Sequence, residues 1–152
     1  MRSAIDGVTL HDLRIIPTPG GPVLHMARPV PPFSVSPAGS PGLNIGEVYF
    51  SETDPGRVKA WKCHVRQTQR FAVPCGRLKI VLYDDREDAR GRLEEYVLGR
   101  PDAYRLLCIP PRVWYGFAAL GDTPALLCNC PDLPHDPAEA LRRDISEIPY
   151  RW

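Results

Sequence analysis

The chain has 152 residues, enough for one domain with a single core. Its 19 basic and 18 acidic side chains give a net charge of +1, so bulk charge offers no case for binding nucleic acid or an anionic membrane. No apolar run approaches the length of a membrane span, and Asp6, His11 and Asp12 interrupt the region where a signal peptide needs apolar residues. We therefore expect a cytoplasmic protein.

Residues 1–45 are predicted to form an N-terminal arm. Between Pro17 and Pro41 this segment is rich in Pro, Gly and Ser, with a short extended piece at 23–28. The chain has 18 prolines and 12 glycines, which argues against long helices.

Residues 46–152 are predicted to form the barrel. Short runs rich in β-branched and aromatic residues alternate with turn signals such as Asp54-Pro55-Gly56. The predicted strands are 45–52, 57–65, 68–73, 78–84, 104–110, 113–120 and 125–130. This spacing indicates a sandwich or small barrel of antiparallel strands.

Two other segments are not predicted as strands. Residues 84–100 are polar and charged, which favours a surface loop or a short helical turn. Asp136 can cap a helix, Pro137 suits its first position, and Ala140, Leu141 and Ile145 give an apolar stripe. The sequence therefore predicts a short C-terminal helix from about Pro137 to Ile145.

The five cysteines are odd in number and are not spaced as a disulfide framework. Cys128-Asn129-Cys130 is too tight for an ordinary zinc knuckle. We expect reduced thiols that are mostly buried.

The stretch from Gly56 to Gly76 has the spacing of a metal-binding barrel motif. Five residues separate Gly56 from Lys62, and one residue separates Lys62 from His64. Four residues then precede Gln69, and six more precede Gly76. Every interval matches the first motif of the cupin barrel, in which the positions of Lys62, His64 and Gln69 carry metal ligands.

The second cupin motif has a histidine ligand five residues after a proline. Here Tyr115 follows Pro110 at that distance. Only His64 among the four ligand positions suits a transition metal, because an ammonium has no lone pair and an amide is a weak ligand. We expect the barrel to hold no metal and no cofactor.

Strand side chains alternate between two faces, so Lys62 and His64 are predicted to share the inward face. By the same alternation Lys59, Trp61 and Cys63 face the other way, and Trp61 is expected to pack against the sheet or at an interface.

Three runs, "GEVYFSETDPGRVKAWKCH", "GRLKIVLYDDR" and "IPPRVWYGFAALGDTPALLCNCPD", resemble the dTDP-4-dehydrorhamnose 3,5-epimerase family. The resemblance covers roughly Gly46 to Asp132. It implies a jelly-roll cupin that works without metal on a nucleotide-linked keto-deoxysugar, such as a dTDP-sugar. It also implies a homodimer, in which an N-terminal strand adds to the partner's sheet.

The resemblance also implies site residues, one position at a time. Lys59 stands where the family has an arginine that contacts phosphate, and Lys62 stands in place of the histidine base. Cys128 aligns with the tyrosine that delivers a proton on the opposite face. The candidate catalytic residues are Lys62, Asp84, Tyr115 and Cys128. The candidate substrate-binding residues are Glu47, Lys59, His64, Gln69 and Phe117.

Each candidate also has a structural interpretation. Lys62 is a base, an amine that forms a Schiff base, or a structural lysine paired with Asp84 or Glu47. Cys128 can simply pack in the core, and Asp84 can be a solvated charge in a turn. His64 and Tyr115 can be wall residues.

Three functions remain open from the sequence. The first is an epimerase or isomerase acting on a nucleotide-linked keto-deoxysugar, in which both usual acid/base residues are replaced. The second is the same barrel acting as a cyclase or isomerase on another small molecule in secondary metabolism. The third is a non-catalytic barrel that binds a sugar nucleotide or a partner protein.

Overall fold

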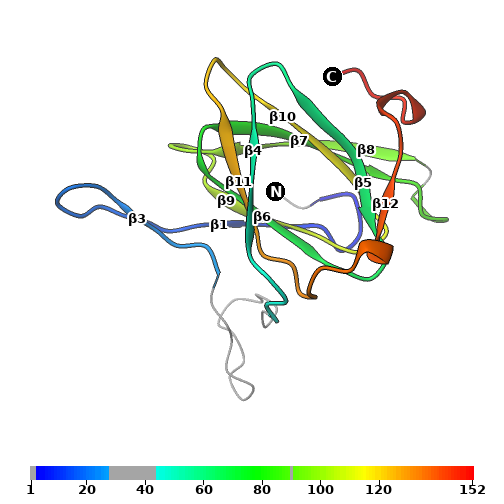
Figure 1. Cartoon of the computed structure of the whole chain (residues 1–152), viewed down its shortest axis with the longest axis horizontal. Helices are drawn as coiled ribbons and strands as arrows, with labels where there is room; N and C mark the ends of the chain where they lie inside the picture. The colour runs from blue at the N-terminus through cyan, green and yellow to red at the C-terminus, as the bar shows by residue number, and fades with distance from the viewer. Residues whose placement is uncertain (1–2, 28–43, 90) are drawn as a thin grey trace.

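The computed structural model describes residues 3–27, 44–89 and 91–152, and these residues are almost entirely β-structure. Two five-stranded antiparallel sheets face each other (Figure 1). The first sheet, in spatial order, contains β1 (Thr9–Asp12), β9 (Arg105–Ile109), β6 (Gln69–Cys75), β11 (Ala125–Asn129) and β4 (Tyr49–Thr53). The second contains β12 (Ala140–Arg142), β5 (Val58–His64), β10 (Trp114–Ala119), β7 (Arg77–Asp84) and β8 (Arg92–Gly99). The predicted all-β jelly-roll cupin fold is confirmed.

The core lies between the two sheets and follows the two-residue period of the strands. On β7, Leu78, Ile80 and Leu82 are fully buried in the inner cluster. Val81, between them, packs on the outer face with Trp61. The predicted outward orientation of Trp61 is therefore confirmed.

The two glycines that frame the motif form turns. Gly56 and Gly76 have φ values of 70° and 71°, in the left-handed region that favours glycine. A Cβ atom on Gly76 would lie 2.6 Å from the Cα atom of Ala125. The β6–β7 turn thus depends on a residue without a side chain.

The N-terminal segment contributes to the barrel as well as projecting from it. Strand β1 pairs with β9 at the edge of the first sheet, although the sequence assigned it to the arm. Strands β2 (Ile15–Ile16) and β3 (Val23–Leu24) form a two-stranded hairpin that extends away from the barrel (Figure 1). Part of the Pro-rich arm, residues 28–43, lies outside the described residues.

The predicted C-terminal helix is wrong. Only Pro137–Glu139 form a single 3₁₀ turn, in which the Asp136 side chain accepts from the amide of Ala138. Ala140–Arg142 then pair with β5 as strand β12, and a second 3₁₀ turn follows at Ile145–Glu147. Asp136 and Pro137 start the turn as predicted. The chain then pairs with the open edge of β5 instead of continuing as a helix.

The prediction of a loop at residues 84–100 is also wrong in its second half. Arg92–Gly99 form β8, which pairs with β7 along its whole length. Charged side chains such as Glu94 and Glu95 obscured the strand in the sequence, and they are typical of an edge strand.

Four of the five cysteines are buried, as predicted, and all five are free thiols. Within the described ranges, no helix is long and apolar enough to cross a bilayer.

Candidate functional site

A cavity of about 370 Å³ opens between the sheets beside β5. Its apolar lining consists of Phe71, Phe117 and Leu127 together with Val58, Ala60 and Trp61 of β5. Its polar lining consists of Tyr49, Ser51, Lys59, Lys62, Tyr115 and Arg142. Cations and phenols thus converge on an otherwise apolar space, the usual composition of a small-molecule site.

A bulge in β5 turns both of its lysines toward this cavity. Lys62 pairs with Tyr115, but Lys59 pairs with Phe117, so β5 has one more residue than β10 between the two pairs. Opposite residues of an antiparallel pair share a face, and Tyr115 and Phe117 both belong to the inner core. Strict alternation, which placed Lys59 on the outer face, is wrong here because of the extra residue.

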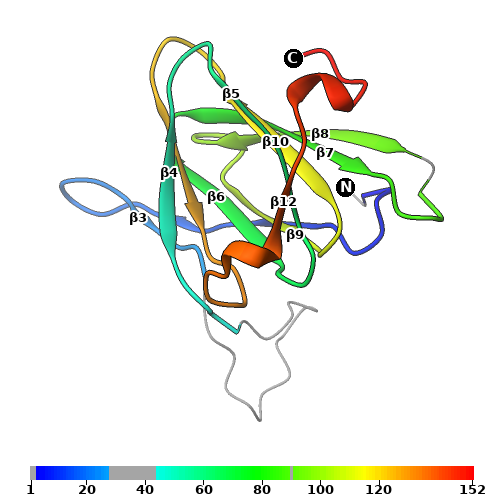
Figure 2. The same cartoon turned by 45° about the vertical axis from the view of Figure 1, so that its right-hand side comes forward.

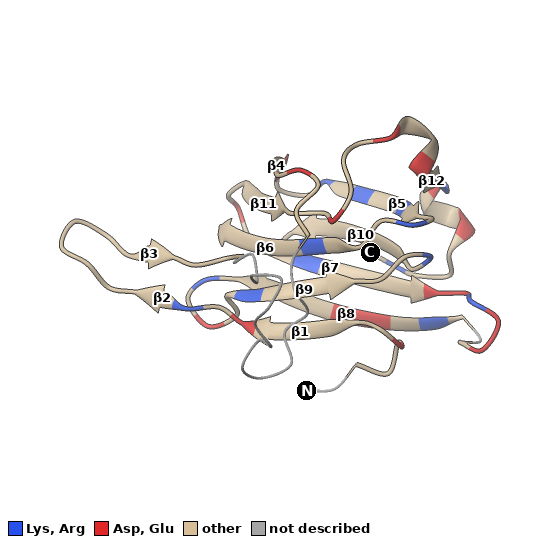
Figure 3. Cartoon of the chain, turned by 90° about the horizontal axis from the view of Figure 1, so that it is seen from below, with Lys and Arg blue, Asp and Glu red and all other residues tan. Residues whose placement is uncertain are grey.

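Arg142 is the third cation of the cavity, and sequence reasoning missed it. It lies on β12 directly opposite Lys62. The sequence placed it in a helix, so nothing indicated its proximity to the lysine. Figure 3 shows the basic positions on β5 close to β12.

The surroundings of Lys62 lower its pKa. Burial lowers the pKa of Lys62, the charge of Arg142 lowers it further, and the charge of Glu47 opposes both to a smaller extent. Lys62 has no carboxylate within 4.0 Å in the part of the chain that the structure describes. The ion pair with Asp84 or Glu47 that a structural lysine would need is therefore not seen there.

Lys59 is held at the rim of the cavity by β4. Its Nζ atom donates to the Ser51 hydroxyl at 3.0 Å and to the Glu52 carbonyl at 2.5 Å. The ammonium is exposed, and it is therefore available to an anion that enters the cavity.

His64 and Tyr115 form a hydrogen-bonded pair behind Lys62. The His64 Nε2 and Tyr115 Oη atoms are 3.2 Å apart, and the two rings are parallel. Burial, and then the charge of Lys62, lower the pKa of His64 to about 4, so its ring is neutral at physiological pH. Burial raises the pKa of Tyr115 well above its ordinary value. Both groups are therefore neutral and can exchange a hydrogen bond.

The tautomer of His64 decides what Tyr115 can do. The Nδ1 atom of His64 is buried and has no hydrogen-bond partner among the described residues. A proton on Nε2 leaves only an acceptor unpaired at Nδ1, whereas the other tautomer strands a donor, the rarer case in proteins. We assign the proton to Nε2, which then donates to Tyr115 and leaves the phenol hydrogen free for the cavity.

A chain of buried amides reaches the cavity from the other sheet at Tyr49. Gln69 Nε2 donates to Gln67 Oε1 at 2.7 Å, and Asn129 Nδ2 donates to Gln69 Oε1 at 2.6 Å. Asn129 Nδ2 also donates to the Tyr49 hydroxyl at 2.8 Å. Because the Tyr49 oxygen accepts this bond, its own hydrogen is free to point into the cavity.

Sequence reasoning missed Tyr49 too. Its run, "IGEVYFSE", was predicted as a strand, but alternation alone does not identify the side chain that faces a cavity. Burial raises the pKa of Tyr49, although the bond from Asn129 works the other way.

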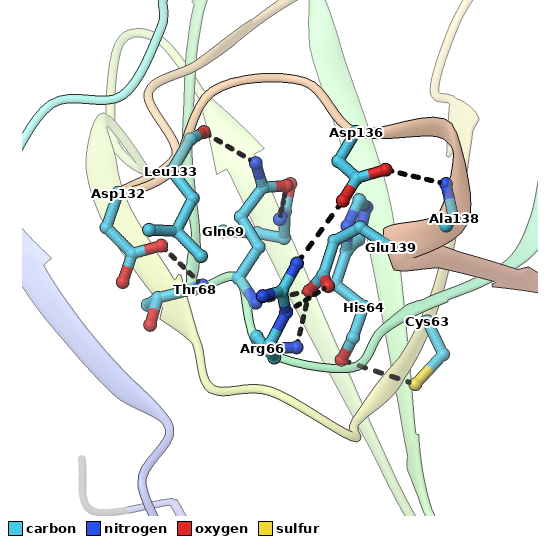
Figure 4. Close-up of polar contacts among 11 residues, drawn as sticks. Cys63, His64, Arg66, Thr68, Gln69, Asp132, Leu133, Asp136, Ala138 and Glu139 are labelled. Atoms are coloured by element: carbon cyan, nitrogen blue, oxygen red, sulfur yellow. Dashed lines mark hydrogen bonds and ion pairs between the residues drawn. The ribbon is translucent and has the colours of Figure 1, made fainter.

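The turn between β5 and β6 is fixed to the segment that leads into β12 (Figure 4). The buried Glu139 carboxylate accepts from the backbone amides of Arg66 and Gln67 and, at 3.0 Å, from the Arg66 guanidinium. Asp132 accepts from the amide of Thr68 at 2.8 Å. Burial tends to raise the pKa of Glu139, but these hydrogen bonds hold it below the usual value. This carboxylate network and the pairing of β12 with β5 together hold Arg142 beside Lys62.

Two predicted catalytic residues lie away from the cavity. Asp84 is buried at the end of β7, where Arg86 Nη2 donates to it at 2.7 Å, and it borders a separate hollow of about 660 Å³. Acidic positions cluster around this end of β7 (Figure 3). Cys128 is opposite Ala72, which packs in the outer cluster, so β11 turns Leu127 rather than Cys128 toward the cavity.

Of the remaining predicted binding residues, one lines the cavity and two lie near it. Phe117 lines the cavity directly. Gln69 is 1% exposed and acts through the amide chain. Glu47 is half-buried just before β4, near enough to influence Tyr49 and Lys62 electrostatically. Among the described residues, no group of three or more His, Cys, Asp or Glu could hold a metal ion.

Comparison with known proteins gives two curated relatives, while no family model matches. The chain is 40% identical over 105 residues to the probable low-salt glycan biosynthesis epimerase Agl13 of Haloferax volcanii, covering 67% of this chain and 65% of Agl13. It is 32% identical over 115 residues to the spore coat polysaccharide biosynthesis protein SpsL of Bacillus subtilis, covering 72% of this chain and 76% of SpsL. The match to Agl13 thus spans slightly less than two thirds of that relative.

A solved structure matches almost the whole chain. The crystal structure of a dTDP sugar isomerase from Desulfovibrio desulfuricans G20 is 54% identical, covers 97% of this chain and 91% of its own, and superimposes with a TM-score of 0.85. Sequence, fold and cavity agree, and the chain belongs to the dTDP-4-dehydrorhamnose 3,5-epimerase-like family of sugar-nucleotide epimerase and isomerase cupins.

Proposed function

We propose that this protein is a metal-independent epimerase or isomerase that acts on a nucleotide-linked keto-deoxysugar, most simply a dTDP-sugar. The observation that carries the proposal is the position of Lys62. Its pKa is lowered, and it lines a cavity that two phenols and two further cations also line. An amine of this kind suits proton removal next to a carbonyl.

Lys59 and Arg142 bind the diphosphate of the substrate in this proposal. Both line the cavity, and both are cations at its polar side. Arginine can hold a phosphate with two parallel hydrogen bonds, and lysine contributes a point charge. The relative of known structure named as a dTDP sugar isomerase supports a nucleotide diphosphate as the anion.

The lowered pKa enlarges the fraction of Lys62 that is a neutral amine, and in this proposal that form begins the reaction. It takes the proton from the carbon next to the keto group, and the electron pair of the broken C–H bond moves into the carbonyl. The developing oxyanion accepts a hydrogen bond from Tyr115, whose phenol hydrogen is free when His64 donates to it.

Tyr49 completes the reaction from the opposite sheet. Its phenol gives a proton to the carbon on the face away from Lys62, which inverts the centre as the carbonyl re-forms. Its phenolate then regains a proton from solvent, and the Lys62 ammonium releases to solvent the proton that it took. Its position in the cavity and the bond from Asn129 support this role. In this proposal Tyr49 takes the role that the resemblance implied for Cys128.

We also propose that the protein is a homodimer. Val48 and Phe50 are 54% and 63% exposed beside and on β4, which is an edge strand in the described part of the chain. Exposed apolar side chains on a strand edge favour a partner strand, and a second copy of the chain is the partner expected from the resemblance.

A deuterium experiment tests the proposed activity. The purified protein is incubated in D₂O with dTDP-4-keto-6-deoxyglucose, and NMR follows the protons next to the keto group. We expect loss of a proton signal and the appearance of an isomer, together with a rise in the thermal midpoint on adding dTDP. The absence of both deuterium exchange and dTDP binding would refute the proposal. Binding without exchange would favour the non-catalytic barrel, and exchange in another keto compound only would favour the recruited cyclase or isomerase.

A further inference from the structure

Tyr150 and Trp152 pack on the outer face of the second sheet, and Figure 2 shows the C-terminus beside this sheet. The ring centroids of Trp152 and Trp61 are 5.2 Å apart, and Tyr150 packs edge-on against both rings. Trp61 is 1% exposed and lies within the β5 bulge, between Ala60 and Lys62. The outer aromatic cluster therefore touches the segment that carries the cavity lysines.

Gly116 shows how closely Trp152 fits against this bulge. A Cβ atom on Gly116 would lie 2.5 Å from the Ala60 Cβ atom and 2.7 Å from Trp152 Cζ2. Gly116 stands between Tyr115 and Phe117, directly opposite the extra residue of β5. Ala60, Gly116 and the Trp152 ring thus meet where the register shifts.

We propose that Trp152 is a positioning residue that maintains the bulge and thereby keeps Lys59 in the cavity. Without the bulge, pairing continued from Lys62 and Tyr115 would set Ala60 opposite Phe117 and Lys59 opposite Ala118. Lys59 would then face outward, and only Lys62 would remain inside. The benefit to substrate binding rests on the proposed function, whereas the effect on the strand does not.

The ring of Trp152, rather than its polar atom, carries this role. Its Nε1 atom is buried and has no hydrogen-bond partner among the described residues. Trp152→Phe removes that unpaired donor and keeps an aromatic ring on Gly116. It should therefore retain the bulge, whereas Trp152→Ala should lose it.

Crystal structures of the full-length variants test the inference directly. In Trp152→Ala we expect regular pairing of β5 with β10 and Lys59 on the outer face, and in Trp152→Phe the native register. Leu106→Ala, in the cluster behind the other sheet, is the control for a general loss of packing and should leave Lys59 in place. If Trp152→Ala does not fold, Trp152→Leu serves in its place. Lys59 still in the cavity of the folded variant would overturn the inference.

Binding of dTDP provides the second readout. Lys59→Met should weaken binding about tenfold in the native background and less than about twofold in Trp152→Ala, because the lysine has already left. Equal effects in both backgrounds would contradict the inference. If the unmodified protein does not bind dTDP at all, the proposed function fails, and the position of Lys59 in the crystal structure still decides the inference.

Discussion

Lys62 and Arg142 lie opposite each other on β5 and β12, and both line the cavity. An arginine remains charged at any physiological pH, so its proximity disfavours a second charge on the lysine. One pair of residues can therefore supply two different properties, a permanent cation for an anionic substrate and an amine that gives up its proton easily.

Lys62→Met keeps the length of the side chain and removes the base. We expect kcat/KM to fall by roughly 10²–10⁴-fold, the usual range for a general base. The free energy of unfolding should change by less than about 1 kcal/mol, because no described carboxylate is left unpaired. Steady-state kinetics and urea unfolding measure the two effects, with Lys79→Met on the outer face as control.

The pH profile gives a further check on Lys62. The neutral amine is the active form, so kcat/KM should rise with pH through the lowered pKa of Lys62, below the value of about 10.4 for a free lysine. If Lys62→Met instead lowered the free energy of unfolding by about 3–5 kcal/mol, Lys62 would be part of a buried ion pair.

Arg142→Gln and Arg143→Gln form a matched pair of adjacent substitutions. Arg142 lines the cavity, whereas Arg143 stacks on Trp114 at 4.1 Å and pairs with Asp85 at 2.8 Å on the outer face. We expect Arg142→Gln to raise the Kd for dTDP about tenfold or more. It should also move the rising limb of the kcat/KM profile to higher pH, because the pKa of Lys62 increases when the charge is removed. Arg143→Gln should leave the Kd nearly unchanged. Calorimetric titration distinguishes them, and equal losses in both variants would contradict a direct role for Arg142.

The strands that the sequence predicted are those with strong local signals. Leu78, Ile80 and Leu82 alternate with outward residues, and two glycines mark tight turns, so β7 and its neighbours were recognisable. Short or charged edge strands such as β8 and β12 were missed, because long-range pairing rather than local preference determines them.

The candidate site was only partly predictable for a related reason. The cupin spacing identified Lys62 and Tyr115, which the structure brings together. The bulge in β5 turns Lys59 toward the cavity, whereas the alternation of side chains along β11 turns Cys128 away from it. Such changes of one residue in register cannot be read from a motif.

His64→Gln should make stability less sensitive to acid. The pKa of His64 is about 4 in the folded protein and about 6.5 when unfolded, so between these values only the unfolded chain binds the proton. The free energy of unfolding is therefore highest above pH 6.5, and about 3 kcal/mol of it is lost as the pH falls toward 4. Urea unfolding at pH 7 and pH 4.5 should show a smaller decrease for His64→Gln than for the half-buried control His11→Gln on β1. Identical decreases would mean that His64 is already charged in the folded protein.

Phe50→Asp tests the proposed homodimer. It adds a charge to the exposed edge at β4, and desolvating that charge in an interface is costly. We expect light scattering to give a dimer mass for the unmodified protein and a monomer mass for the variant at micromolar concentration. Val97→Asp, on the edge strand β8, should remain a dimer, and a monomeric unmodified protein would refute the proposal.

Tyr49→Phe separates the two proton transfers of the proposed reaction. The variant keeps the ring in the cavity and loses only the phenol that Asn129 orients. Lys62 can still remove the substrate proton, so deuterium exchange from solvent should continue, whereas formation of the inverted product should fall by roughly 10²-fold or more. Tyr115→Phe should slow both processes together, because it removes the hydrogen bond to the developing oxyanion. NMR in D₂O follows exchange and product in one sample. Equal loss of exchange and product in Tyr49→Phe would place Tyr49 with the oxyanion instead, and full activity would exclude it from the reaction.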